Sequence, residues 1–146
     1  MVSRVRLPVD FVIYDEQGNR SVLLEAKRRF GLDRAWAMAW HQMLCASLGA
    51  PPAASVVFVA PDRIYAWKQG ATPAAPPDWE FDAKPWLEPY FARLKLDAQA
   101  VDGWGFEQVV GLWLRDLVEA GVQDGSAPGE MFHALRGGQV VQQEAA

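Results

Sequence analysis

Three charged residues near the N-terminus, two acids and one lysine, have a spacing that could bring their side chains together. Asp10 precedes one apolar run, Phe11–Tyr14, and Glu25 and Lys27 follow a second one, Ser21–Leu24. The polar segment between the runs contains Asp, Gly and Asn, the composition of a β-hairpin turn. The sequence therefore predicts an antiparallel hairpin with the three charged residues at its open end.

The register of this hairpin decides whether the charged residues meet. Directly opposite residues of an antiparallel pair have a constant sum of residue numbers, about 35 or 37 for a loop of two or four residues. Asp10 is then opposite Glu25 or Lys27, and all three side chains leave the same face of the sheet. A three-residue loop would break this relation unless a β-bulge restored it.

Two neighbouring carboxylates and an ammonium group suggest a particular chemistry. Ionised carboxylates side by side repel, and either a raised pKa or a bound cation relieves the repulsion. Mg²⁺ suits such a site because it prefers oxygen ligands and keeps several waters and a substrate phosphate. The metal can activate a water and polarise a phosphoryl oxygen, while Lys27 can stabilise the developing negative charge.

The pattern Pro8-x-Asp10 followed by Glu25-Ala26-Lys27 resembles that of the PD-(D/E)XK nuclease superfamily, which has the restriction-endonuclease-like fold. The resemblance implies that Asp10, Glu25 and the backbone carbonyl of Ala26 bind Mg²⁺ or Mn²⁺ and that Lys27 is the catalytic lysine. It extends over roughly residues 1–68. The chain also looks like small uncharacterised bacterial proteins of this superfamily.

The sequence departs from the family pattern in several places. Val9 separates the Pro from Asp10, and Asp10 comes too early for the helix that many members place before the first core strand, often with an additional Glu. One side of the sheet therefore needs cover from a partner or from the C-terminal half. Some members carry a Gln on the following helix that touches the site; Gln42 is the candidate, although the Tyr that often follows is missing. Arg29 shares strand parity with Lys27 and is a candidate phosphate contact.

The elements after the hairpin continue the expected order of helix and strand. Asp33 can cap a helix over Arg34–Leu48 that ends at Gly49. Its heavy apolar stripe should be Trp36, Trp40, Met43 and Leu44. Strands are expected over Ser55–Ala60 and Arg63–Lys68, around a turn at Pro61-Asp62.

A Pro-rich connector over residues 70–78 separates this core from a helical extension at about residues 79–121. Helices are predicted from about Pro85 to Leu94 or Leu96 and from about Phe106 to Ala120, ended by Gly121. Their aromatic residues are expected in the core or at a dimer contact, and one or two of Trp79, Trp86 and Trp104 at an exposed interface.

The expected fold class is α/β, with a restriction-endonuclease-like core of a central mixed β-sheet flanked by helices and a helical C-terminal extension. The 146 residues are enough for a sizeable core in one domain. We expect this domain over residues 1–136, with the core at about residues 1–70, and a disordered tail over residues 137–146. The Ser55 strand should lie beside the Glu25 strand.

The cysteine content and the hydropathy of the sequence indicate the cellular compartment. The single Cys45 lies in an apolar helix pattern, which excludes a disulfide framework and indicates a reducing compartment. The sequence shows no signal peptide and no apolar run of about 18 residues, so we expect a cytoplasmic protein without a membrane segment.

Charge is the main argument against a nucleic-acid enzyme, because the net charge is −4 and the pI is about 5.1. However, residues 1–36 contain seven basic and five acidic side chains, a net charge of +2, which places a basic region at the candidate site. We expect weak, salt-sensitive DNA binding by a monomer.

Two functions remain open from the sequence. The first is a metal-dependent nuclease that acts on DNA rather than RNA, as a homodimer, because proteins of this fold often pair to reach both strands. The alternative is a catalytically silent module of the same fold whose Trp-rich helices bind a protein partner. The nuclease requires Asp10, Glu25 and Lys27 to converge in an accessible cleft. In the silent module these side chains can instead form salt bridges with nearby arginines.

Overall fold

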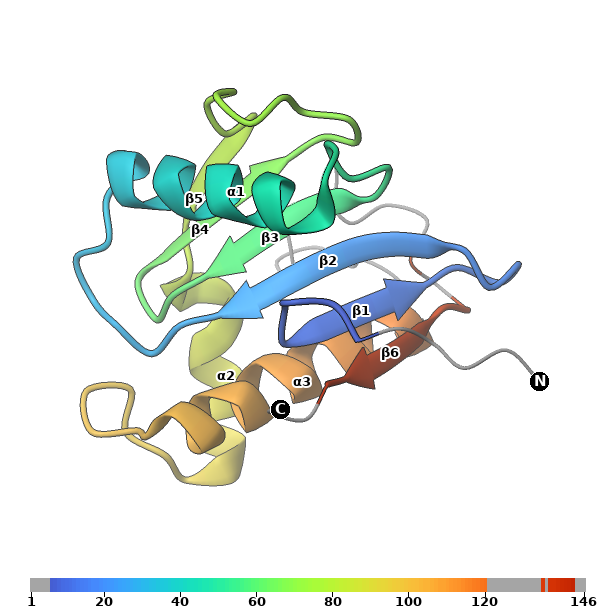
Figure 1. The fold of residues 1–146 in the computed structure, drawn as a ribbon. Helices are drawn as coiled ribbons and strands as arrows, with labels where there is room; N and C mark the ends of the chain where they lie inside the picture. Colours follow the sequence, from blue (N-terminus) through green and yellow to red (C-terminus); the bar gives the residue numbers. More distant parts are fainter. Residues whose placement is uncertain (1–5, 121–134, 136, 144–146) are drawn as a thin grey trace.

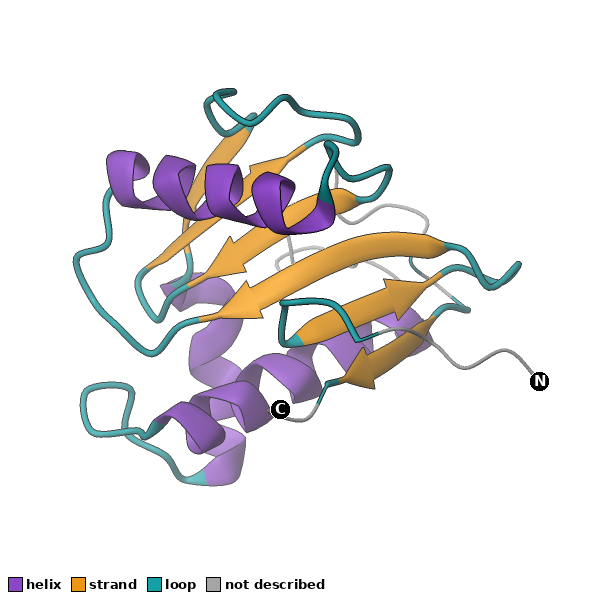
Figure 2. Cartoon of the chain, viewed as in Figure 1, coloured by secondary structure: helices purple, strands orange, loops and turns teal. Residues whose placement is uncertain are grey.

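The computed structural model describes residues 6–120, 135 and 137–143, and an open, mixed β-sheet lies at its centre (Figure 1). The strands are β1 (Phe11–Tyr14), β2 (Arg20–Ala26), β3 (Ser55–Val59), β4 (Arg63–Trp67), β5 (Trp79–Asp82) and β6 (Gln139–Gln142). Their order is β5-β4-β3-β2-β1-β6; β2 and β3 are parallel and all other neighbours antiparallel. Three helices complete the described fold: α1 (Arg34–Leu48), α2 (Lys84–Leu94) and α3 (Gly103–Ala120) (Figure 2). The predicted α/β class is confirmed, and β3 lies beside β2 as expected.

Helix α1 connects the parallel strands β2 and β3 and covers one face of the sheet (Figure 1). Its predicted ends are confirmed: the Asp33 side chain accepts a hydrogen bond from the Trp36 N–H at 2.9 Å, and Gly49 ends the helix with a φ of 78°. The predicted apolar stripe is wrong at Met43, whose exposed fraction is 60%. The helical period instead turns His41 inward, where its ring stacks on Trp67 with centroids 4.5 Å apart.

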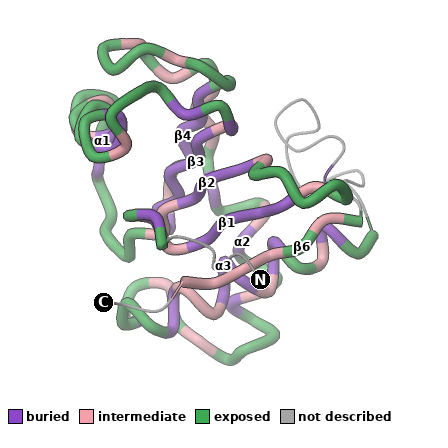
Figure 3. The backbone as a smooth tube through the Cα atoms, turned by 45° about the vertical axis from the view of Figure 1, so that its right-hand side comes forward, coloured by how far each residue is buried: buried purple, intermediate pink, exposed green. Residues whose placement is uncertain are grey.

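Helices α2 and α3 cover the opposite face of the sheet, so the C-terminal half supplies the cover that this face was expected to need. The central strands are therefore buried on both faces (Figure 3). The core under α2 and α3 consists of buried apolar side chains from the strands and helices, among them Phe11, Leu24, Val59, Phe106 and Trp113. None of the helices in the described part of the chain is long and apolar enough to cross a bilayer.

The predicted disordered tail is wrong for residues 139–142, which form strand β6 against β1. Gly138 makes this approach possible, because a Cβ atom there would lie 2.6 Å from the Tyr14 carbonyl oxygen. Gly137 precedes it with a φ of 84°, and its N–H donates to the Val118 carbonyl at 2.8 Å. Gly137 and Gly138 thus form the turn that brings β6 to the sheet edge. Residues 144–146 and the predicted helix end at Gly121 lie outside the described residues.

Two further boundaries differ from the prediction. Strand β5 was not predicted, because its four residues lie at the sheet edge beside a Pro-rich segment that reads as a loop. Helix α3 begins at Gly103, earlier than the predicted Phe106. Asp102 explains this start, since its Oδ1 accepts a hydrogen bond from the Gly105 N–H at 2.6 Å and caps the first turn.

Candidate active site

The hairpin has the register that places Asp10 opposite Glu25. Phe11 pairs with Leu24, and the Asp10 N–H donates to the Leu24 carbonyl at 3.1 Å. The loop over residues 15–19 has an odd length, but a bulge opposite the Ile13–Tyr14 step restores the required register. The Asp15 side chain shapes this loop by accepting hydrogen bonds from the Gln17 and Asn19 N–H groups at 3.0 and 2.8 Å.

The Asp10 carboxylate is held by the partner strand. Strand β2 extends past the start of β1, and the Ala26 N–H donates to Asp10 Oδ2 at 2.8 Å. The amide and carbonyl of one residue point to the same side of an antiparallel strand. The Ala26 carbonyl therefore points toward the β1 side, where Asp10 lies.

Glu25 is half-buried on the α1 face of the sheet, which it shares with the core residue Leu23. Its pKa is raised from 4.5 to about 8, first by burial and then by the hydrogen bond and the charge of Asp10. The Lys27 ammonium and a hydrogen bond with Trp40 of α1 act in the opposite direction on this pKa. The structure thus brings Asp10, Glu25 and Lys27 together.

A third carboxylate that the sequence analysis missed belongs to the same cluster. Glu107 of α3 has its pKa raised to about 7 by burial, by the charge of Asp10 and by a hydrogen bond with it. Gly111, one turn further along α3, lets the helix lie against β1, because a Cβ there would be 3.2 Å from Phe11 Cε1. No local pattern relates Glu107 to Asp10, which is 97 positions away in the sequence.

Two members of the cluster, Asp10 and Glu107, line a cavity of about 460 Å³. Its walls come from the N-terminal segment, the first turns of α3 and the end of β6: Arg6, Asp10, Trp104, Glu107, Gln108, Gln142 and Gln143. Ion pairs among the described residues include those of Arg34 and Arg63 with Glu80 and of Arg93 with Asp116. None of these pairs involves Asp10, Glu25 or Lys27. Asp10 lines the cavity, whereas Glu25 and Lys27 are not among its walls.

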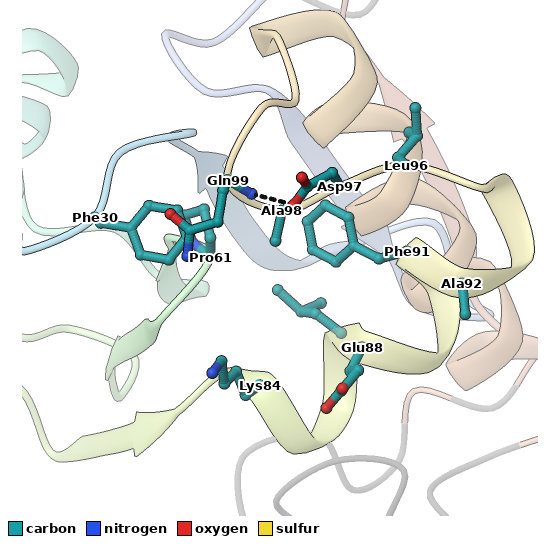
Figure 4. A pocket seen from close by; sticks show the side chains of 11 residues that line it. Phe30, Pro61, Lys84, Glu88, Phe91, Ala92, Leu96, Asp97, Ala98 and Gln99 are labelled. Atoms are coloured by element: carbon teal, nitrogen blue, oxygen red, sulfur yellow. Dashed lines mark hydrogen bonds between the residues drawn. The ribbon is translucent and has the colours of Figure 1, made fainter.

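A second cavity, of about 380 Å³, lies between α2 and the segments that follow β2 and β3 (Figure 4). Its walls are largely apolar, with Phe30, Pro61, Leu87, Phe91 and Leu96 among them. None of the clustered carboxylates lines this second cavity. We therefore assign the chemistry to the cavity lined by Asp10 and Glu107, the acidic cavity.

Two predicted site residues are not brought to the carboxylates. Gln42 is exposed on α1, on roughly the opposite side of the helix from Trp40, which contacts Glu25. The parity argument for Arg29 is wrong because β2 ends at Ala26; the Arg29 N–H then donates to the Lys27 carbonyl at 2.8 Å in a tight turn. Arg29 is therefore an exposed loop residue.

The donor chemistry of the cluster fits a hard divalent cation. Within residues 6–120, 135 and 137–143, no group of three or more His, Cys, Asp and Glu side chains is arranged to hold a metal ion. Mg²⁺, however, is usually bound through one or two carboxylates together with waters and substrate phosphates. Asp10 and Glu25 supply two carboxylates, and their hydrogen bond requires a proton that a cation could replace.

Metal-free protein is expected to lose stability as the pH rises from about 4.5 to about 8. In this window folded Glu25 keeps a proton that the unfolded chain has already released, so a higher pH favours unfolding. Glu107, with its pKa near 7, acts in the same direction. A Glu25→Gln variant is neutral at this position at every pH, so its stability should fall less. Urea unfolding in EDTA at both ends of the window tests this; equal pH slopes for variant and wild type would contradict it.

Gln143, just after β6, fastens the segment that leads into Asp10. Its N–H donates to the Asp10 carbonyl at 2.8 Å. Its side-chain amide donates to the Leu7 and Val9 carbonyls at 2.8 and 2.6 Å and accepts from the Leu7 N–H at 3.0 Å. The C-terminal end of the described chain therefore holds the backbone on the N-terminal side of Asp10.

Gln143→Ala is expected to lower the free energy of unfolding by about 1–3 kcal/mol, because it removes the partners of half-buried backbone groups. Gln139→Ala is the matched control: it changes the same residue type at an exposed position of β6 and should cost less than about 0.5 kcal/mol. Urea unfolding of the two variants measures the difference. Equal costs would contradict the assigned role of Gln143.

Comparisons with protein-family models, with curated proteins and with solved structures gave no match to this chain, so the site is interpreted from its own geometry.

Proposed function

We propose that this protein is a metal-dependent phosphodiester hydrolase that acts on DNA and has a restriction-endonuclease-like core. The observation that supports the proposal most is the meeting of Asp10, Glu25 and Lys27 at the carboxyl end of β2. Each of these residues is accounted for by the chemistry of phosphodiester cleavage. A folding core has no need of two adjacent, half-buried carboxylates.

The arrangement of the strands also supports the proposed fold. An antiparallel hairpin, β1-β2, is followed by the crossover through α1 to the parallel strand β3 and then by antiparallel β4. The site lies where β1 begins and β2 ends. The parallel neighbour β3 has its carboxyl end at the same side of the sheet, because Val59 pairs with Ala26. Helix α3 covers the face that an N-terminal helix would otherwise cover and adds Glu107.

Asp10, Glu25 and the Ala26 carbonyl would hold Mg²⁺ or Mn²⁺, with Glu107 as a further carboxylate beside Asp10. A bound Mg²⁺ would lower the pKa of a water ligand and polarise a phosphoryl oxygen. Lys27 is exposed and close enough to Glu25 to lower its pKa, so its ammonium can offset negative charge that develops on the phosphate. The Ala26 amide orients one carboxylate oxygen of Asp10, whose side chain also contacts Glu25 and Glu107.

The acidic balance of the chain also has a consequence for substrate binding. With carboxylates lining the cavity, a phosphodiester would be repelled unless a cation neutralised them. Binding to DNA should therefore require the divalent metal and weaken with salt. A homodimer, which would give access to both strands, is part of this proposal.

A cleavage assay tests the proposal. Wild-type protein should cut DNA in the presence of Mg²⁺ or Mn²⁺ and not in EDTA, and Lys27→Met should reduce the rate by about 100- to 1,000-fold. Lys84→Met is the matched control, because Lys84 is also an exposed lysine but lines the apolar cavity. Folded wild type that binds metal but cleaves neither DNA nor RNA would favour the silent, partner-binding alternative.

A further inference from the structure

An exposed tryptophan stands at the rim of the acidic cavity. Trp104 lies in the first turn of α3 with an exposed fraction of 70%, whereas Trp67 and Trp113 are completely buried. On a helix, residues three and four positions apart lie on the same side, so Trp104 shares a face with Glu107 and Gln108. All three residues line the cavity into which Asp10 opens.

The backbone under Trp104 is held firmly. The Asp102 side chain caps this turn through the Gly105 N–H, and the Phe106 N–H donates to the Asp102 carbonyl at 3.0 Å. Phe106 is completely buried in the core under α3. The indole is thus presented to solvent from a capped helical turn that packs on the core.

The remaining walls of the cavity supply hydrogen-bonding groups of both kinds. Gln108 and Gln142 each offer an amide donor and a carbonyl acceptor, and Arg6 contributes a guanidinium group. An aromatic face combined with amide groups suits a flat heterocycle with donors and acceptors on its edge, which describes a nucleobase. An organic cation would also be attracted to the indole and the carboxylates. It would not, however, match the combined donors and acceptors of the two amides.

We propose that Trp104 is a stacking platform for an unpaired nucleobase, so that the protein acts on single-stranded nucleic acid or on single-stranded ends. The inference rests on the proposed hydrolase function, because the phosphate next to the stacked base would lie at the carboxylates. A base offers its face to an indole only when it has left the duplex stack. Helix α3 therefore contributes both the indole and Glu107, one turn apart.

Fluorescence anisotropy with a labelled, phosphorothioate-linked oligothymidine tests this inference in the presence of Mg²⁺. Trp104→Ala should weaken binding by about 10- to 100-fold, and Trp104→Phe should restore most of it, since stacking needs an aromatic ring. Phe30→Ala is the matched control, because Phe30 is an exposed aromatic residue at the other cavity. It should leave the affinity unchanged, and a blunt duplex should bind more weakly than the single strand.

The outcomes separate this inference from the function on which it rests. Equal affinities of Trp104→Ala and wild type, with Mg²⁺ binding intact by calorimetry, would overturn the stacking role and leave the hydrolase proposal standing. Absence of Mg²⁺ binding to folded wild type would overturn the hydrolase proposal itself. A third outcome is that the protein binds spermidine but not oligothymidine. If Trp104→Ala abolished that spermidine binding and Mg²⁺ displaced it, the cavity would be a cation site and the inference would be overturned.

Discussion

Asp10→Asn is expected to abolish calorimetrically detectable Mn²⁺ binding and to slow metal-dependent cleavage by at least about 100-fold. Asp10 is the common partner of the cluster, since it contacts Glu25, Glu107 and the Ala26 amide. Asparagine keeps an oxygen that can accept the Ala26 N–H, so the hairpin should remain intact. The loss would therefore come from the missing charge and not from unfolding.

The same substitution should change two neighbouring carboxyl groups. The hydrogen bond and charge of Asp10 both raise the pKa of Glu25 and of Glu107, so both pKa values should fall in Asp10→Asn. Burial still raises them, and they should not return fully to 4.5. Carbon-detected NMR titration of the glutamate carboxyls would follow these values.

Glu88→Gln is the control for metal binding, because Glu88 is an exposed acid on α2 that lines only the apolar cavity. It should bind Mn²⁺ as wild type does, while Glu25→Ala should fail to bind. Wild-type affinity in Asp10→Asn would show that the metal, if bound, is held elsewhere.

Phe11→Ala is expected to lower the free energy of unfolding by about 3–5 kcal/mol, a large part of the stability of a domain of this size. Phe11 is completely buried between the sheet and α3, and its ring packs against the backbone of Gly111. Alanine would leave a void under the helix that carries Glu107. Because Asp10 is the preceding residue, the variant should also weaken metal binding.

Urea unfolding measures this cost, and Met43→Ala provides the comparison. Met43 is also a large apolar residue, but 60% of it is exposed on α1, so its removal should change the stability by less than about 0.5 kcal/mol. Phe11→Leu should fall between the two, because it refills much of the void. A cost below about 1 kcal/mol for Phe11→Ala would mean that α3 does not pack on β1 as described.

The features that could be predicted from the sequence are those specified over short distances along the chain. The hairpin, the placement of Asp10 opposite Glu25 or Lys27, and the ends of α1 follow from a turn composition, a strand period of two and two capping residues. The bulge in the hairpin then selects Glu25. Met43 was wrongly predicted to lie on the buried face of α1, because the apolar residues of this helix allow more than one buried stripe. Packing on the sheet decides which stripe is buried, and it buries His41 against Trp67.

The rest of the site was decided by tertiary structure. Glu107 and Trp104 reach the cavity because α3 docks on β1 through Gly111 and Phe11, and Gln143 reaches Asp10 because β6 pairs with β1. These contacts join residues far apart in the sequence, 97 positions for Glu107 and Asp10 and 133 for Gln143 and Asp10, where neither period nor turn chemistry carries information. The sequence by itself thus determined the pair of strands that brings two carboxylates together. The tertiary structure alone determined which residues surround these carboxylates. The reason is that the packing of α3 on the sheet and the pairing of β6 with β1 depend on contacts between distant segments.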